Sequence, residues 1–293
     1  MISMFPFITF FSPLLLYTLT LAPTYIPVDS AEFALCIEVW GVCHPPGFPL
    51  YILIGKIFTQ LFPFGSLIYK ANLLSALFAA GTILLTYLTL IKLRVKTHIA
   101  LLLSLLLAVS SAFWEFSVAA DVFTFNTFLL SLTFFLAFSQ RRLLSLLVLG
   151  LSASHFYLSI VLFPLFIWYY WGFKPGLKLL IAIAVFLLGL FPQVIMYVRM
   201  RESPPVNWGH VQNFSEFLNF VTRKEFGSFF LINNPVLTFS LMRFFRHIVV
   251  YLYSLSTNLG IVLPVVALVL IFFGKGFKNR SVRFLFVSFL ALL

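Results

Sequence analysis

Charge is scarce in this chain. Only 9% of its residues are charged and 62% are hydrophobic, whereas an ordinary globular domain has about 25% charged residues. The mean hydropathy of +1.08 excludes an average soluble domain. Apolar runs long enough to cross a bilayer recur along the sequence, so we predict an all-α polytopic membrane protein.

Acidic residues are scarcer than basic ones, with eight against nineteen. In a soluble protein the net charge of +11 would suggest a nucleic-acid partner. Here most basic residues fall in short loops between apolar runs, where the positive-inside rule predicts them. We therefore expect membrane lipids, and no nucleic acid, among the partners.

Cysteine is limited to Cys36 and Cys43. If the segment between them is helical, its rise separates them by roughly 10 Å, which is too far for a disulfide. We therefore expect packing as small side chains, with a bridge only if the segment turns.

The apolar runs predict about eight spans in a single domain, 1–293. A first outer loop, 23–66, is expected to hold two interfacial helices, 31–40 and 47–62. The last run is too short to span, so we expect either a fragment or an incomplete last helix. The expected apolar segments are 5–21, 67–90, 99–113, 122–138, a broken pair over 143–171, a span reaching Val198, one near 252–273, and 284–293.

Orientation follows from the loops. With the N-terminus inside, alternation places the basic residues of 92–96, 141–142, 174–178 and 275–283 on the cytoplasmic side. The same alternation places all eight acidic residues on the opposite side. Because acidic residues contribute little to topology, their one-sidedness indicates an acidic extracytoplasmic site.

Three of the eight acidic residues lie within ten positions of each other: Asp29, Glu32 and Glu38. Asp29 and Glu32 would share one face of a helical turn. One interpretation is a general base with a supporting carboxylate. The other is a helix N-terminus, with Asp29 or Ser30 as N-cap and Glu32 adding charge to the first turn.

Further candidates for substrate binding lie along the outer side. His44 begins a rigid His-Pro-Pro-Gly turn. Asp121 and Glu115 lie at the next outer loop, where an acidic residue is a functional candidate by default. His155 marks a break in 143–171. Lys56 either contributes to the site or snorkels from a helix end.

The outer segment 199–247 combines basic and aromatic residues. Basic residues facing outward run against the topology preference, and arginine binds phosphate oxygens bidentately. A lipid phosphate would explain them, whereas snorkelling or an interfacial aromatic belt is the alternative. The candidates here are Arg201, Trp208, Arg223 and Lys224.

The run from Asp29 to Phe58, DSAEFALCIEVWGVCHPPGFPLYILIGKIF, resembles the signature of a family first catalogued as a domain of unknown function. That family is now grouped with protein O-mannosyltransferases of the GT-C glycosyltransferase superfamily. The stretches VAADVFTFN, GLSASHF and NWGHVQNFSEFLNFVTRKEFG are also similar. Val28 and Ala31 stand where the family has glycine, Phe48 where it has tyrosine, and Asp121 where it often has glutamate.

The resemblance implies a GT-C-like membrane core. It implies that Asp29 is the catalytic base for an acceptor hydroxyl and Glu32 its supporting acid. The donor would be a polyprenyl- or dolichyl-phosphate sugar, with mannose the sugar most closely implied, and the acceptor a protein or a glycan. The site would face the outside of a bacterial or archaeal plasma membrane, or the lumen of the endoplasmic reticulum.

Two other functions remain open from the residues alone. A transporter or flippase of a lipid-linked substrate would place charged groups near the bilayer midplane on broken helices, and only the break near His155 favours it. A catalytically silent assembly subunit would tolerate the replaced glycines. Paired carboxylates are also able to hold Mg²⁺ or Mn²⁺, but no metal ligands are assigned.

Overall fold

We describe the fold from a computed structural model of the chain, which describes residues 4–27, 29–172, 176–227 and 279–292, with a few single positions between 242 and 253. This part is helical apart from one isolated parallel bridge between Val42 and Asn207. The α-helices are α1 (Phe5–Leu19), α2 (Ser30–Val39), α3 (Pro49–Leu61), α4 (Leu67–Lys92), α5 (Thr97–Ala108), α6 (Ser111–Ser117), α7 (Val122–Phe138), α8 (Arg142–His155), α9 (Leu162–Trp171), α10 (Leu177–Gly189), α11 (Phe191–Arg201), α12 (Phe214–Val221) and α15 (Arg280–Leu292), and the 3-10 helices are η1 (Tyr157–Val161) and η2 (Lys224–Phe226).

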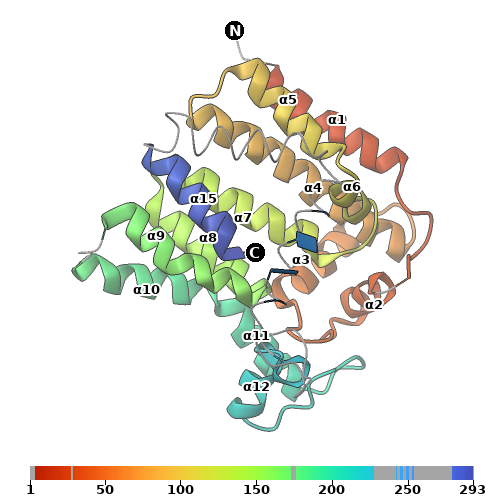
Figure 1. Cartoon of the computed structure of the whole chain (residues 1–293). Helices are drawn as coiled ribbons and strands as arrows, with labels where there is room; N and C mark the ends of the chain where they lie inside the picture. The colour runs from red at the N-terminus through yellow and green to blue at the C-terminus, as the bar shows by residue number, and fades with distance from the viewer. Residues whose placement is uncertain are drawn as a thin grey trace.

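The helices form a bundle in which sequence neighbours are often not spatial neighbours. Contacts run in the order α1, α4, α7, α8 and α10, with α5 beside α1 and α4 and α15 against α9 (Figure 1). Helices α2, α3, α11 and α12 gather at one end of this bundle, where the first loop meets the outer segment (Figure 1). The candidate site lies at that end.

Small residues determine how closely the helices approach. A Cβ on Gly150 of α8 would lie 2.2 Å from the carbonyl oxygen of Phe186, and one on Gly189 would lie 2.7 Å from the Cα of Gly150. Only glycine therefore permits the crossing of α8 with α10. The buried alanines of α4 serve the same purpose, as is usual between membrane helices.

Membrane-spanning length is clearest in two places. Of the described residues, Leu67–Lys92 and Leu177–Arg201 are long and apolar enough to cross a bilayer, and the pair Thr97–Ala108 and Ser111–Ser117 would make a third if counted as one bent span. Other apolar helices are shorter. The total of about eight spans and the interfacial placement of α2 and α3 stay predictions.

The predicted segments agree well with the helices, with one correction. The span expected over 99–113 ends at Ala108, and a 65° bend separates it from α6. Ser110 interrupts the helix by taking an extended backbone and bonding back to the carbonyl of Leu107 (2.9 Å). Residues 114–116, expected in the connection between segments 99–113 and 122–138, belong to α6 and are helical. The span expected near 252–273 lies outside the described residues.

The broken pair predicted over 143–171 is confirmed. Helix α8 ends at His155, a short 3-10 turn follows, and α9 begins at Leu162. The break comes at Phe156, whose backbone is extended, just after the Ser152–His155 stretch that predicted it.

Candidate active site

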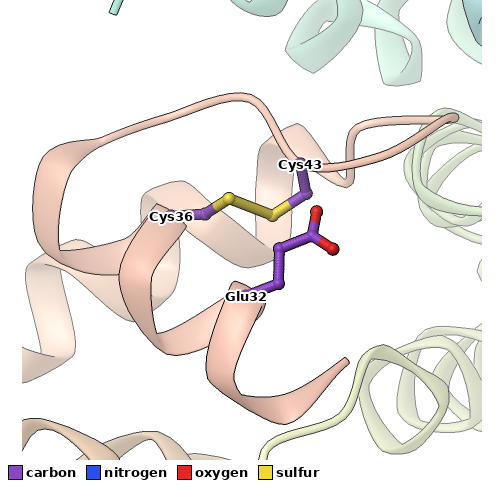
Figure 2. A group of neighbouring side chains, drawn as sticks. All are labelled: Glu32, Cys36 and Cys43. Atoms are coloured by element: carbon purple, nitrogen blue, oxygen red, sulfur yellow. A yellow bond between two sulfur atoms is a disulfide. The ribbon is translucent and has the colours of Figure 1, made fainter. Parts of the chain in front are cut away.

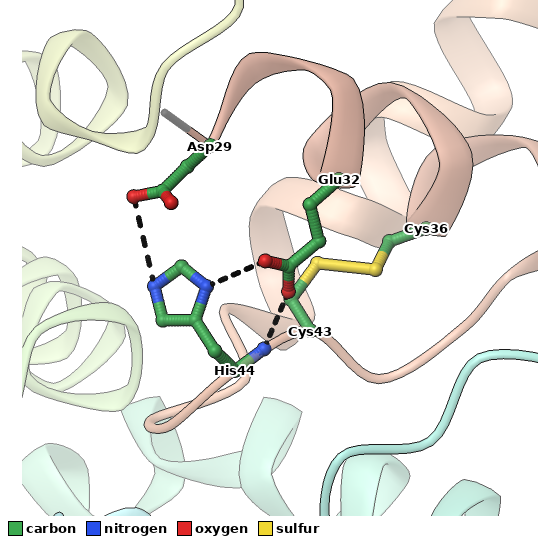
Figure 3. Close-up of a disulfide and its surroundings, with 5 residues drawn as sticks. All are labelled: Asp29, Glu32, Cys36, Cys43 and His44. Carbon is green, nitrogen blue, oxygen red and sulfur yellow. Dashed lines mark hydrogen bonds and ion pairs between the residues drawn. A yellow bond between two sulfur atoms is a disulfide. The ribbon is translucent and has the colours of Figure 1, made fainter. Parts of the chain in front are cut away.

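The site begins at the first turn of α2. Asp29 occupies the N-cap position and Glu32 the first turn, and both side chains point toward the loop that follows the helix (Figure 3). The carboxylate of Asp29 makes no capping hydrogen bond. Asp29 therefore occupies the predicted N-cap position, but its side chain does not cap the helix and is available for another role.

His44 joins the two carboxylates. Its backbone N–H donates to Oε1 of Glu32 (2.7 Å), and its ring Nδ1 lies 3.0 Å from Oε2 of the same residue. Nε2, on the far side of the ring, lies 4.0 Å from Oδ2 of Asp29 (Figure 3). Residues twelve positions apart in the sequence thus form one acid–histidine cluster.

A disulfide joins Cys36 and Cys43 (Figure 2) and brings the adjacent His44 back to α2 (Figure 3). The expectation of unlinked cysteines is wrong, because the segment turns. Helix α2 ends at Val39, Trp40 takes a left-handed conformation, and the N–H of Gly41 returns to the carbonyl of Cys36 (2.8 Å). The two Cα atoms are consequently 6.1 Å apart, within disulfide range.

Electrostatics hold Glu32 in its ionised form. Partial burial opposes ionisation, but the hydrogen bonds and charge of His44 outweigh it and lower the pKa of the Glu32 carboxyl. A carboxylate that accepts two such bonds is a fixed acceptor. Glu32 is therefore suited to orient His44 rather than to exchange protons.

Asp121 adds a third carboxylate from another part of the chain. It lies just outside α7 and caps it, with Oδ1 accepting from the N–H of Phe123 (2.7 Å). Burial, reinforced by the negative charge of Asp29, raises the pKa of Asp121 to about 6. The carboxylates of the first and second outer loops are thus close enough to interact electrostatically.

Two polar residues of α4 hold Asp121 in place. Asn72 accepts from the N–H of Ala120 (2.7 Å) and donates to the carbonyl of Ala22 (3.0 Å), while Ser75 accepts from the N–H of Asp121 (3.1 Å). Neither residue was predicted from the sequence. Their signal was two polar residues three apart, hence on one face, inside an apolar span.

The outer segment docks on the first loop directly before His44. The N–H of Val42 donates to the carbonyl of Val206 (2.8 Å), and the N–H of Trp208 donates to the carbonyl of Val42 (3.2 Å). Arg199 donates from Nε to the carbonyl of Trp40 (2.8 Å), and its guanidinium lies over the Trp40 ring. Arg199 therefore contacts the first loop.

This docking closes a polar cavity of about 400 Å³ beside His44. Pro45, Trp208 and Arg223 line it, together with Glu216 and Glu225. The Trp208 ring lies 6.3 Å from the His44 ring. The Nε of Arg223 is buried and has no hydrogen-bond partner in the described part of the chain, so this cation is available to a ligand.

An apolar groove of about 550 Å³ lies on the other face of α12. Its walls come from α8, η1, α11 and Leu190, which lies between α10 and α11, while α12 contributes Phe214, Phe217 and Leu218. Other α12 residues, Glu216, Asn219 and Phe220, line the polar cavity. One short helix therefore separates a polar space from an apolar one.

Four predicted site residues are not brought to the cluster. The Nζ of Lys56 donates to the carbonyl of Glu38 near the end of α2. Arg201 and Lys224 are exposed and line neither space. His155 is fully buried against the rings of Phe48, Tyr51 and Phe125, and its Nε2 bonds to the carbonyl of Val122 (3.0 Å).

Two groups resemble a metal site. The ligand atoms of Asp29, Glu32 and His44 lie within 4.8 Å of one another, as do those of Glu32 and the two cysteines. The sulfurs are joined in the disulfide and are no ligands. The first set combines carboxylates with imidazole, which suits Mn²⁺ better than Mg²⁺, but hydrogen bonds within the cluster already account for its geometry. We assign no metal.

Fold and site together define a helical membrane protein with an acid–histidine cluster on its first loop. Residues 29–176, about half of the chain, match the family model described as the N-terminal domain of protein O-mannosyl-transferase TMEM260. The chain belongs to this family, which confirms the resemblance to O-mannosyltransferases.

Two curated relatives agree. Protein O-mannosyl-transferase TMEM260 of Mus musculus is 30% identical over 239 residues, covering 75% of this chain and 34% of the relative. Protein O-mannosyl-transferase tmem260 of Dictyostelium discoideum is 24% identical over 308 residues, covering 93% of this chain and 37% of the relative. The chain thus spans about a third of the length of these relatives. No solved structure matches it.

Proposed function

We propose that this protein is a membrane glycosyltransferase that moves mannose from a polyprenyl- or dolichyl-phosphate donor to a hydroxyl of a protein acceptor. The two relatives are named as protein O-mannosyl-transferases. The observation that carries the proposal is the free carboxylate of Asp29, which lies in the acid–histidine cluster next to the polar cavity.

The reaction is an inverting substitution at C1 of the sugar. Asp29 removes the proton of the acceptor hydroxyl while the acceptor oxygen forms a bond to C1. The bond between C1 and the phosphate oxygen breaks, and the lipid phosphate leaves with the electron pair. Arg223, whose buried Nε has no hydrogen-bond partner among the described residues, holds the phosphate both in the bound donor and in the departing lipid.

The two spaces on either side of α12 support a lipid-linked donor. A polyprenyl-phosphate sugar has an apolar chain and an anionic, polar head. The apolar groove suits the chain, and the cavity with Arg223 and Trp208 suits the head. Because α12 borders both spaces, one donor molecule would pass around this helix.

The disulfide supports an extracytoplasmic or lumenal site. Disulfides persist in oxidising compartments and are rare in the cytosol. Cys43 directly precedes His44, so the cluster lies on whichever side holds the disulfide. This agrees with the orientation predicted from the basic loops, for a bacterial or archaeal plasma membrane or the endoplasmic reticulum.

The test uses the purified full chain in liposomes with radiolabelled polyprenyl-phosphate mannose and a mixture of serine- and threonine-containing peptides. We expect label to enter the peptides with wild type and not with folded Asp29→Asn. Equal transfer by both would remove Asp29 from its role and favour the assembly-subunit alternative. If wild type transfers no sugar from a panel of lipid-phosphate donors, the enzyme proposal fails, and a flippase assay with the same liposomes follows.

A further inference from the structure

The two ring nitrogens of His44 have different surroundings. This difference supports an inference that rests on the proposed function and extends it. One face of the residue, its backbone N–H and ring Nδ1, is committed to the two oxygens of Glu32. The other ring nitrogen, Nε2, faces Asp29 without a hydrogen bond, at 4.0 Å.

The partner determines the tautomer. An ionised carboxylate only accepts hydrogen bonds, so the 3.0 Å contact with Glu32 requires a hydrogen on Nδ1 of His44. In the neutral ring Nε2 then carries a lone pair. A histidine whose first nitrogen is held by a carboxylate has its second nitrogen oriented for proton acceptance.

The surroundings leave one direction open to that lone pair. The rings of Phe33 and Phe48 pack on the imidazole with centroids 5.6 and 5.3 Å away, and Trp208 lies edge to face beyond them. The charged groups that face His44 are Glu32 and Asp29 from the start of α2 and Asp121 from the start of α7. In the described part of the chain no lysine or arginine forms an ion pair with any of the three.

We propose that His44, oriented by Glu32, is a positioning residue that receives from Asp29 the proton taken from the acceptor hydroxyl. The proton moves from the Asp29 carboxyl to Nε2, the ring becomes an imidazolium paired with two carboxylates, and solvent then removes the proton. Asp29 is thereby returned to its ionised form for the next acceptor. The side chain of Asp29 is 44% exposed, so it has room to rotate and close the 4.0 Å gap.

Two isosteric substitutions separate this role from a structural one. Asparagine places its amide N–H near the position of Nδ1, so His44→Asn keeps the bond to Glu32 and removes the group that faces Asp29. Glutamine places its amide near Nε2, so His44→Gln does the reverse. If His44 only anchors the loop, His44→Asn will keep its activity and His44→Gln will lose it.

The proposal predicts a loss in both variants, because neither carboxamide can accept a proton from Asp29, so the activity of His44→Asn distinguishes the two roles. In the peptide-transfer assay His44→Asn should lose roughly 100-fold in kcat, the low end of the range for positioned proton transfer. Added imidazole should restore part of that loss. His98→Ala, at an exposed histidine of α5, should keep wild-type activity with no response to imidazole. Full activity of His44→Asn, or a loss that imidazole does not reduce in folded protein, would overturn the relay.

A spectroscopic measurement tests the tautomer without any transfer assay. In ¹⁵N-histidine-labelled protein, solid-state NMR at a pH where the ring is neutral should show His44 with hydrogen on Nδ1, assigned by its loss in His44→Asn. Glu32→Gln should mix the tautomers. Hydrogen on Nε2 in wild type would overturn the inference, whereas absent sugar transfer with the expected tautomer would count against the proposed function alone.

Discussion

The first loop and the outer segment form the two sides of the site, and they are held in different ways. In the first loop, Phe33, Cys36 and Cys43 are almost fully buried, and a disulfide and the bonds of His44 close it. In the outer segment, Trp208 is 56% exposed and Phe214 is 61% exposed. Backbone bonds at Val42 join the two.

This contrast assigns different tasks to the two regions. Proton transfer requires groups held to within fractions of an ångström, and the loop with Asp29 and Glu32 is constrained covalently. A segment that must admit a bulky lipid-linked donor gains from few constraints. We therefore expect substitutions in the first loop to lower kcat, and substitutions in the outer segment to change KM for the donor.

The largest effect is expected for Asp29→Asn. Removing the base should lower kcat for peptide mannosylation by about 10²- to 10⁴-fold with little change in thermal stability, because Asp29 caps no helix N–H. The assay is initial rates at saturating donor. Glu115→Gln, at an exposed acid of α6, is the matched control, and a comparable loss there would contradict a specific role for Asp29.

A smaller loss is expected when the disulfide is removed. The double variant Cys36→Ser with Cys43→Ser should destabilise the fold by about 2 kcal/mol, the entropy estimate for a short closed loop, and lower kcat by about tenfold as His44 loses its alignment. Thermal melts and initial rates measure both. Reductant should lower the Tm and the initial rate of wild type but not those of the double variant. Equal sensitivity of the two proteins would show that the loss does not come from this disulfide.

Arg223→Gln should mainly affect donor binding. Loss of a charge-assisted bond to phosphate should raise KM for the polyprenyl-phosphate sugar by about tenfold and leave kcat within a small factor. Steady-state kinetics over a donor series measures the split. Lys224→Gln, at the exposed neighbour that lines neither space, should change KM less. If the two variants behave alike, general surface charge and not the cavity attracts the donor.

The last prediction concerns stability against pH rather than turnover. Burial raises the pKa of Asp121 to about 6 from 3.8, so the folded protein binds this proton more tightly, and stability falls as pH rises from about 4 to 6. Asp121→Asn keeps an N-cap. At pH 7 its free energy of unfolding should exceed that of wild type by at most about 3 kcal/mol, which thermal melts will show as a higher Tm. The difference should disappear near pH 4, and a constant difference would exclude ionisation as its cause.

Periodicity and length in the sequence predicted most of the described helices, and α7 to the residue, because apolar runs between polar loops determine helices locally. The short helices α6 and α12 were not predicted. Of the site, the motif predicted Asp29, Glu32 and His44, and the structure brings these together with Asp121. It could not show that a left-handed turn at Trp40 would pair the cysteines, since local helix propensity favours continuation. Nor could it identify Asn72 and Ser75, which act through contacts with residues distant in sequence.

Gly47 couples the first loop to α11 in a way that should be visible in evolution. Its φ of +88° favours glycine, and a Cβ there would lie 2.3 Å from Sδ of Met196 in α11. The two positions therefore share one volume. Relatives that carry a larger residue at position 47 should carry a smaller one at position 196, so covariation of this pair across the family would record the docking of α11 on the loop that holds His44.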